Sequence, residues 1–213
     1  MDKYANYDDL KQHEIKGEDY VILSRAGTSR IAVIALHGGG IEPGTVDIAD
    51  ALAGAEHSFY AFKGIKKKGN AVLHISSTKF DEPEGIRIAE KAETVVSIHG
   101  CRSKYDTVFV GGRNQNLKEK ICHILEKAGF NSEISEKEGL HGQHPENICN
   151  RCLSGEGVQL EITRGLREKM FDNLAKRRLR KRNELFFRFV ETLRESLRTE
   201  IADGGIENYA AKR

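Results

Sequence analysis

The segment Ile34–Gly44, with the sequence IALHGGGIEPG, decides how this chain is expected to fold. An apolar run typical of a buried strand ends abruptly at His37. Three glycines follow, and then come Glu42 and a proline that can open a helix. In open α/β sheets, ligands bind at the carboxyl ends of the strands. The segment therefore predicts a ligand crevice at a sheet edge, lined by His37 and Glu42.

Outside this segment, short apolar runs alternate with amphipathic stretches along the chain. Several runs are continuous in valine and isoleucine, which is typical of strands covered on both faces. The pattern predicts a single-domain α/β fold over residues 1–213, with a mixed, mostly parallel sheet flanked by helices. Strands are expected at Tyr20–Ser24, Ile31–Leu36, Ser58–Phe62, Val72–Ile75, Thr94–Ile98, Thr107–Val110, Asn131–Ile134 and Val158–Ile162. Helices are expected at Gly44–Leu52, Glu84–Lys91, Leu117–Lys127 and in a long C-terminal segment from Asp172 to Arg198.

The composition excludes several classes of protein. The 213 residues carry a formal net charge of +2, so no global field attracts a nucleic acid or an acidic membrane. No apolar run reaches transmembrane length, and the N-terminus lacks the apolar core of a signal peptide. We expect a soluble, cytoplasmic monomer without nucleic-acid or membrane partners, although release by lysis would leave no trace in the sequence. Four cysteines in a chain of this length predict reduced thiols.

A second buried-type strand, Thr94–Cys101 (TVVSIHGC), also ends in a histidine followed by glycine. Two such endings in one α/β sheet would bring His37 and His99 to the same edge. Together with Glu42 they form a His/Glu/His set, which is a known ligand composition of catalytic zinc with an open fourth position. Taken alone, either histidine is better explained by a hydrogen bond to nearby backbone. For the three residues together, we favour a metal site.

The segment Val158–Ile162 supplies a candidate catalytic carboxylate. Its apolar residues would face one side of a strand, and Glu161 would face the other. A carboxylate in mid-strand is costly to bury without a partner or a cleft, so Glu161 is a candidate general base and acid. Arg164 or Arg167 would then bind a substrate carboxylate or stabilise an oxyanion. The alternative is an ion pair between Glu161 and Arg164 at the strand end.

With these features in place, the chain resembles the phage-type poly-γ-glutamate hydrolases, which are zinc peptidases with a carboxypeptidase-like α/β fold. They are related to N-formylglutamate amidohydrolases and aspartoacylases. The resemblance rests on motifs spread over roughly residues 20–200. These motifs are HGGGIEPG at His37–Gly44, SIHG at Ser97–Gly100, VGGRN at Val110–Asn114, HPENICN at His144–Asn150 and GVQLEI at Gly157–Ile162.

The resemblance implies that His37, Glu42 and His99 bind Zn²⁺ and that Glu161 is the catalytic carboxylate. Zinc-activated water, with Glu161 as general base and then acid, would cleave γ-glutamyl amide bonds of poly-γ-glutamate. The glycines would let the backbone bring His37 and Glu42 together despite their spacing. In the same subgroup, Leu73–Thr78 resembles part of the active-site wall. There His74 would hydrogen-bond substrate or oxyanion, although a strand histidine satisfied by its neighbours is equally consistent.

An anionic polypeptide needs cationic and amide donors along its binding cleft. Arg113, Asn147, Asn150 and Arg167 lie in or beside the motifs and are the candidate substrate-binding residues. The same donors fit a small N-acyl amino acid, so a deacylase is the first alternative. Product size distinguishes the two, because an endopeptidase shortens chains before free glutamate accumulates.

Two further motifs support competing interpretations. The basic run Ala175–Arg182 (AKRRLRKR) would suit a non-catalytic binder of anionic polymer or nucleic acid, with salt-sensitive binding. We favour a packing helix with a solvated basic face, because Phe186, Val190, Leu193 and Leu197 recur at helical spacing. Cys149–Cys152 forms a Cys-x-x-Cys, but no second such motif accompanies it. A redox pair or a structural zinc site is therefore disfavoured.

Overall fold

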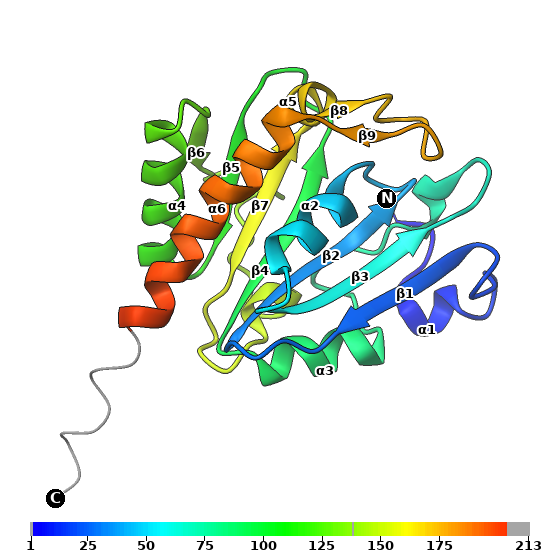
Figure 1. Cartoon of the computed structure of the whole chain (residues 1–213). Helices are drawn as coiled ribbons and strands as arrows, with labels where there is room; N and C mark the ends of the chain where they lie inside the picture. Colours follow the sequence, from blue (N-terminus) through cyan, green and yellow to red (C-terminus); the bar gives the residue numbers. More distant parts are fainter. Residues whose placement is uncertain (1, 138, 204–213) are drawn as a thin grey trace, which may run out of the picture.

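A computed structural model describes residues 2–137 and 139–203, with side chains up to Arg198. Seven strands form one sheet in the order β1-β3-β2-β4-β7-β5-β6 (Figure 1). Their bounds are β1 Tyr20–Arg25, β2 Ile31–Gly39, β3 Ser58–Gly64, β4 Thr94–Cys101, β5 Val108–Gly112, β6 Ser132–Ile134 and β7 Val158–Thr163. The pairs β2–β3, β2–β4, β4–β7 and β5–β6 are parallel, whereas β1–β3 and β5–β7 are antiparallel. The predicted mixed, mostly parallel sheet is confirmed.

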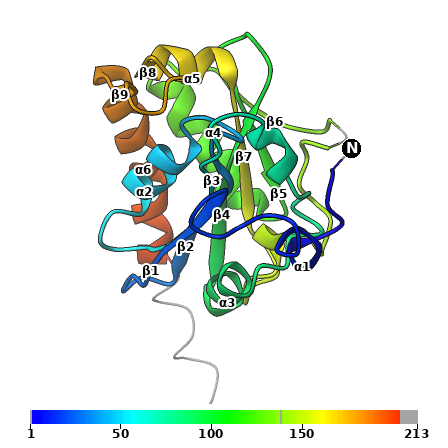
Figure 2. The ribbon, with the colours of Figure 1, turned by 90° about the vertical axis from the view of Figure 1, so that its right-hand side faces the viewer.

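Helices cover both faces of the sheet (Figures 1 and 2). The first core cluster joins the sheet to α2, α4, α5 and α6, and the second joins it to α1, α3 and two short 3-10 helices. The helices are α1 Tyr7–Leu10, α2 Thr45–Ala53, α3 Pro83–Lys91, α4 Gln115–Lys127, α5 Arg164–Met170 and α6 Glu184–Asp203, with 3-10 helices η1 Asn70–Leu73 and η2 Ile148–Asn150. Because helices cover both sides of the central strands, the sequences of these strands are continuous apolar runs.

The strand expected at Val72–Ile75 is wrong. Residues Asn70–Leu73 form the 3-10 helix η1, which begins after Gly69 in a left-handed conformation (φ 75°). Leu73 and Ile75 are buried in the second core cluster, and His74 between them is partly exposed. A short apolar run fits a strand or a packed turn equally well, so its periodicity could not separate the two.

The C-terminal segment is a helix only in its second part. Helix α6 starts at Glu184, and Phe186, Val190, Leu193 and Leu197 are buried on its packed face, as expected. The basic run Ala175–Arg182 does not lie on this helix, so that expectation is wrong. It belongs to a hairpin in which β8 (Phe171–Asp172) pairs with β9 (Lys181–Arg182). Among the described residues, no helix has the length and apolar character needed to cross a membrane.

Candidate metal centre and active site

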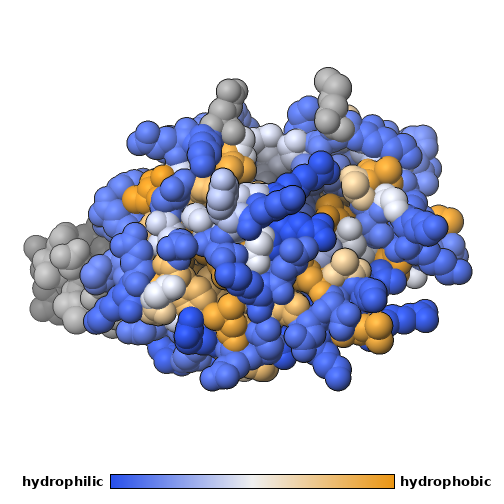
Figure 3. Space-filling model, turned by 90° about the horizontal axis from the view of Figure 1, so that it is seen from above, coloured by the Kyte–Doolittle hydropathy of each residue, from blue (hydrophilic) through white to orange (hydrophobic). Residues whose placement is uncertain are grey.

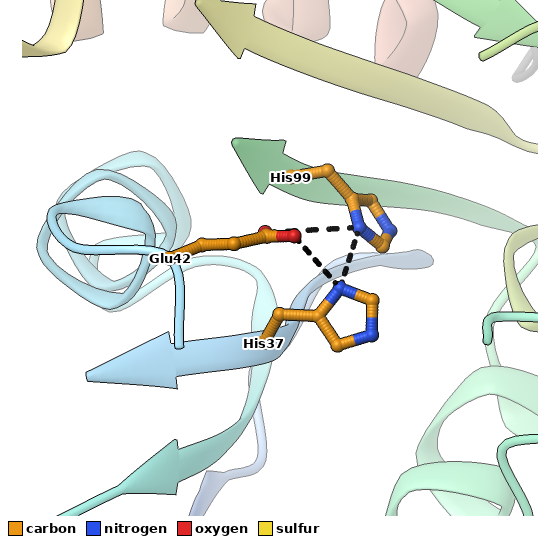
Figure 4. Close-up of side chains that lie close together, drawn as sticks. All are labelled: His37, Glu42 and His99. Carbon is orange, nitrogen blue, oxygen red and sulfur yellow. Dashed lines mark hydrogen bonds and ion pairs between the residues drawn. The ribbon is translucent and has the colours of Figure 1, made fainter. Parts of the chain in front are cut away.

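Three side chains converge at the carboxyl ends of β2 and β4 (Figure 4). His37 Nδ1 lies 3.1 Å from Glu42 Oε1 and 3.1 Å from His99 Nδ1. His99 Nδ1 lies 3.9 Å from Glu42 Oε2. Both histidines are almost fully buried, and the Glu42 side chain is 14 % exposed. The structure therefore brings together the three residues that the sequence proposed as metal ligands, and we call them the His–Glu–His cluster.

The backbone around the three glycines makes this convergence possible. The register between β2 and β3 shifts between Ala35 and Gly38, so His37 lies in an irregularity that redirects its side chain. Gly39 has φ 71°, and a Cβ there would come within 2.2 Å of the Gly64 carbonyl oxygen. The turn closes when the Glu42 amide donates to the His37 carbonyl at 2.7 Å. A strand end without glycine could not place Glu42 beside His37 in this way.

Each member of the cluster is held by a further hydrogen bond. His37 Nε2 donates to the Ile75 carbonyl at 2.8 Å, which leaves Nδ1 to face the cluster. His99 Nε2 lies 2.9 Å from the Ser97 hydroxyl. The Gly100 amide donates to Glu42 Oε2 at 2.8 Å. Partners of this kind fix ring orientation and tautomer in metal sites.

The spacing of these atoms fits a small divalent ion. Two ligand atoms in tetrahedral coordination of zinc are about 3.3–3.4 Å apart, given zinc–nitrogen bonds of about 2.0–2.1 Å. Two of the distances in the cluster are slightly shorter and one is longer, and one ligand atom from each residue lies within 4.8 Å of the others. Two imidazole nitrogens and one carboxylate oxygen form a donor set that suits zinc. The residues present therefore fit the metal that the resemblance implies.

The electrostatics of the cluster are coupled. Burial opposes a charge on His37, but the adjacent Glu42 carboxylate outweighs it and raises the pKa of His37. Burial, together with the nearby His37, lowers the pKa of His99 to about 3. The two directions agree with one shared proton on His37 Nδ1, donated toward Glu42 and His99. A cation bound by the same three atoms would replace that proton.

Glu161 lies on β7 directly beside His99, its partner in the register of β4 and β7. It is buried, and Oε1 accepts a hydrogen bond from Gln159 Nε2 at 3.0 Å. Gln159 Oε1 in turn accepts from Asn147 Nδ2 at 2.9 Å. Burial, reinforced by the charge of Glu42, raises the pKa of Glu161 to about 8. This carboxyl group can thus exchange a proton near neutral pH.

Two cavities meet at the His–Glu–His cluster. The smaller, of about 320 Å³, is lined by the cluster with Glu161, Gln159, Asn147 and the segment Ser76–Thr78. The larger, of about 690 Å³, is lined by Glu42, His74, Arg102, Arg164 and Arg167, among others. Both are lined by residues from the edge where the parallel strands end, and the face seen in Figure 3 is mostly hydrophilic. The arginines thus line the larger cavity, and neutral donors line the smaller one.

The other predicted active-site residues take different positions. His74 stacks on His37 with ring centroids 3.9 Å apart, and it lines both cavities. Arg164 pairs with Glu168 at 2.7 Å, so the alternative of a Glu161–Arg164 ion pair is wrong. Arg167 is buried, and its guanidinium donates to the carbonyls of Pro43, Cys101 and Ile162. The guanidinium nitrogens of Arg167 that could contact a substrate therefore already donate to backbone carbonyls.

The predicted amide and arginine donors are not all at the cavities. Asn147 lines the smaller cavity. Asn150 is buried and donates to the carbonyls of Gly142 and His144, so it holds a loop that lines this cavity. Arg113 follows Gly112, which pairs with Val158 at the start of β7. Since β5 runs antiparallel to β7, Arg113 lies at the opposite edge of the sheet from Glu161.

Sequence reasoning missed three residues that support the site. Ser97 and Gln159 each lie two positions before a functional residue on the same strand face, and this alternation was a usable signal. Asp2 contacts His74, which lies 72 positions further along the chain, and no local pattern could reveal that contact.

Comparison with known proteins identifies a family for this chain. Residues 4–192 match the family described as poly-gamma-glutamate hydrolase. The chain is 36 % identical over 194 residues to YndL of Bacillus subtilis. This alignment covers 90 % of this chain and 76 % of YndL. The chain is 37 % identical over 194 residues to the SPbeta prophage-derived protein YoqZ of the same organism, covering 90 % of this chain and 70 % of YoqZ.

Solved structures show the same fold. A bacteriophage poly-gamma-glutamate hydrolase superposes with a TM-score of 0.89 at 32 % identity, covering 97 % of this chain and 100 % of the other. A zinc-free form of YndL gives a TM-score of 0.89 at 35 % identity, with coverage of 94 % and 99 %. N-formylglutamate amidohydrolase from Ralstonia eutropha shares the fold alone, with a TM-score of 0.55 at 11 % identity and coverage of 87 % and 99 %. The chain belongs to the poly-gamma-glutamate hydrolase family.

Proposed function

We propose that this protein is a zinc-dependent hydrolase that cleaves γ-glutamyl amide bonds of poly-γ-glutamate. The observation that carries the proposal is the His–Glu–His cluster with Glu161 in the same cavity, in a chain of this family. His37, Glu42 and His99 would hold the metal. When bound, zinc supplies a Lewis acid that polarises a carbonyl and lowers the pKa of a water molecule.

The chain's own residues provide the proton transfers. Glu161 takes a proton from the attacking water and delivers it to the departing nitrogen. Its pKa of about 8 keeps both protonation states accessible near neutral pH. Gln159, fixed by Asn147, donates to one carboxylate oxygen of Glu161, and the other oxygen would face the substrate. The burial of Glu161 and of both histidines limits competing contact with bulk water.

Substrate recognition in this proposal uses the two cavities differently. The larger cavity brings Arg102 and Arg164 near Glu42, and guanidinium groups suit carboxylates. Arg102 is exposed and makes no side-chain hydrogen bond or ion pair within the described ranges 2–137 and 139–203, so its donors are available. Arg167 contributes positive charge near the cluster, although its hydrogen bonds go to backbone.

Incubation with poly-γ-glutamate tests the proposal. We expect the purified protein with added zinc to shorten the polymer, as followed by size-exclusion chromatography, and a chelator to stop the reaction. Intact polymer under both conditions would contradict the proposal. Release of product from N-acyl amino acids, with the polymer intact, would favour the deacylase instead.

A further inference from the structure

Asp2 places a carboxylate beside the His–Glu–His cluster. Its oxygens accept hydrogen bonds from His74 Nδ1 at 2.7 Å, from the Ser76 amide at 2.8 Å and from the Ser76 hydroxyl. The three donors come from the segment after η1, and Asp2 lies more than 70 positions earlier in the sequence. His74 and Ser76 therefore form a nest of donors that is shown binding a carboxylate in this structure.

This nest lies within the candidate active site. The His74 ring stacks on His37, one of the candidate metal ligands, with centroids 3.9 Å apart. His74 lines both cavities, Ser76 lines the smaller one and Asp2 lines the larger one. A carboxylate held by His74 and Ser76 thus lies at the junction of the two cavities. A substrate chain bound beside the cluster would pass through this junction.

The N-terminal segment is anchored without help from Asp2. Tyr4, Tyr7 and Leu10 are buried in the second core cluster. The Tyr4 hydroxyl donates to Glu14, and the Tyr7 amide donates to Asp81 at 2.6 Å. Since these contacts fasten the chain from Tyr4 onward, Asp2 can leave the nest while the rest of the segment stays in place.

We propose that His74 and Ser76 form a binding subsite for a substrate carboxylate, and that Asp2 occupies it as an internal competitor. The proposal rests on the proposed function, because the ligand is a carboxylate of the γ-linked chain. In such a chain the α-carboxylate is attached to the same carbon as the scissile nitrogen. A donor nest next to the cluster therefore suits a γ-linked unit, whose carboxylate lies close to the bond being cut.

The exchange of one carboxylate for another keeps the local chemistry balanced. The departing Asp2 side chain moves toward solvent, and the substrate carboxylate takes over the same three hydrogen bonds. No additional charge is buried in the process, and no donor of the nest is left unpaired. Occupation by Asp2 lowers the apparent affinity for substrate. The apparent affinity equals the intrinsic affinity multiplied by the fraction of time that the nest is empty.

Binding of glutarate to the 213-residue chain tests this proposal, measured by calorimetry with and without added zinc. We expect Asp2→Ala to bind glutarate about tenfold more tightly if Asp2 fills the nest nine-tenths of the time. Adding Ser76→Ala to Asp2→Ala should reverse the gain. The matched control is Asp8→Ala, which removes an exposed carboxylate of the same N-terminal segment. Within the described residues, this carboxylate pairs with Lys11 alone. It should bind as the unsubstituted protein does.

Equal or weaker glutarate binding by Asp2→Ala would overturn the proposal and make Asp2 a support for the His74 ring. A second measurement needs no variant, because glutarate should shift the nuclear magnetic resonance signal of the Ser76 amide. An unchanged signal at saturation would also overturn it. Glutarate has no amide to cleave, so a nest that binds it while poly-γ-glutamate stays intact would refute the hydrolase and leave the subsite standing.

Discussion

The His–Glu–His cluster and the basic hairpin both concentrate ionisable side chains, but the two differ in burial and in hydrogen bonding. In the His–Glu–His cluster the two histidines are buried and Glu42 is mostly so. The three side chains point at one another, and each is fixed by a further hydrogen bond. In the hairpin Phe171–Arg182 the cations are mostly exposed, and Arg180 and Arg182 each form an ion pair with Asp47 of α2. Buried polar side chains that meet at one point therefore indicate the candidate site better than a high density of charged residues does.

Replacing Glu161 should give the largest effect. We expect Glu161→Gln to lower kcat by about 10²–10⁴-fold, because general acid–base catalysis contributes about that much. Zinc content should be unchanged, since Glu161 is not one of the three candidate ligands. The measurement is hydrolysis of poly-γ-glutamate alongside metal analysis. Glu156→Gln, in the exposed turn before β7, is the matched control, and full activity of Glu161→Gln with zinc bound would contradict the mechanism.

Ser97 tests whether the second layer of the cluster matters. Its hydroxyl is the 2.9 Å partner of His99 Nε2. Ser97→Ala should weaken zinc binding by about 10–100-fold, the usual loss when an outer partner of a metal ligand is removed. Competition with a chromophoric chelator measures this affinity. The exposed Ser154→Ala serves as the control, and equal affinities of the two variants would show that the hydrogen bond does not orient His99.

The raised pKa of Glu161 predicts a pH dependence of stability in protein stripped of metal. Between the ordinary glutamate pKa and about 8, the folded state holds a proton on Glu161 that the unfolded state has lost. This contribution to the free energy of unfolding is present at low pH and is lost as the pH rises through 8. Glu161→Gln removes it, so the variant should gain stability relative to the parent as the pH rises. Chemical denaturation at pH 5, 7 and 9 would detect this, and parallel curves would contradict it.

The basic hairpin should give the smallest effect. Lys176 and Arg178 are exposed, and neither forms an ion pair in the part of the chain that the structure describes. Lys176→Ala with Arg178→Ala should change hydrolysis by less than about twofold, because exposed charges are screened at physiological salt. A loss of hydrolysis as large as that expected for Glu161→Gln would reverse the comparison and support a polymer-binding role for this hairpin.

The sequence was most informative where backbone chemistry is local. Glycines after His37 and the apolar run before it predicted a strand, a turn and two candidate metal ligands. The alternation in β7 predicted Glu161 on the face opposite the first core cluster. The hairpin was missed because basic residues fit a solvated helix face as well as a turn. Asp2 and Arg113 depend on contacts between distant segments and on strand direction, which periodicity does not encode.

The central claim is that one zinc ion binds between His37, Glu42 and His99. Metal analysis of the purified chain after zinc loading and desalting tests it most directly. We expect one zinc per chain, and a large loss in His99→Ala, because two remaining ligands hold the ion poorly. His123→Ala, a change in helix α4 away from both cavities, should retain the metal. Full retention of zinc by His99→Ala, or no zinc in the parent chain, would contradict the account.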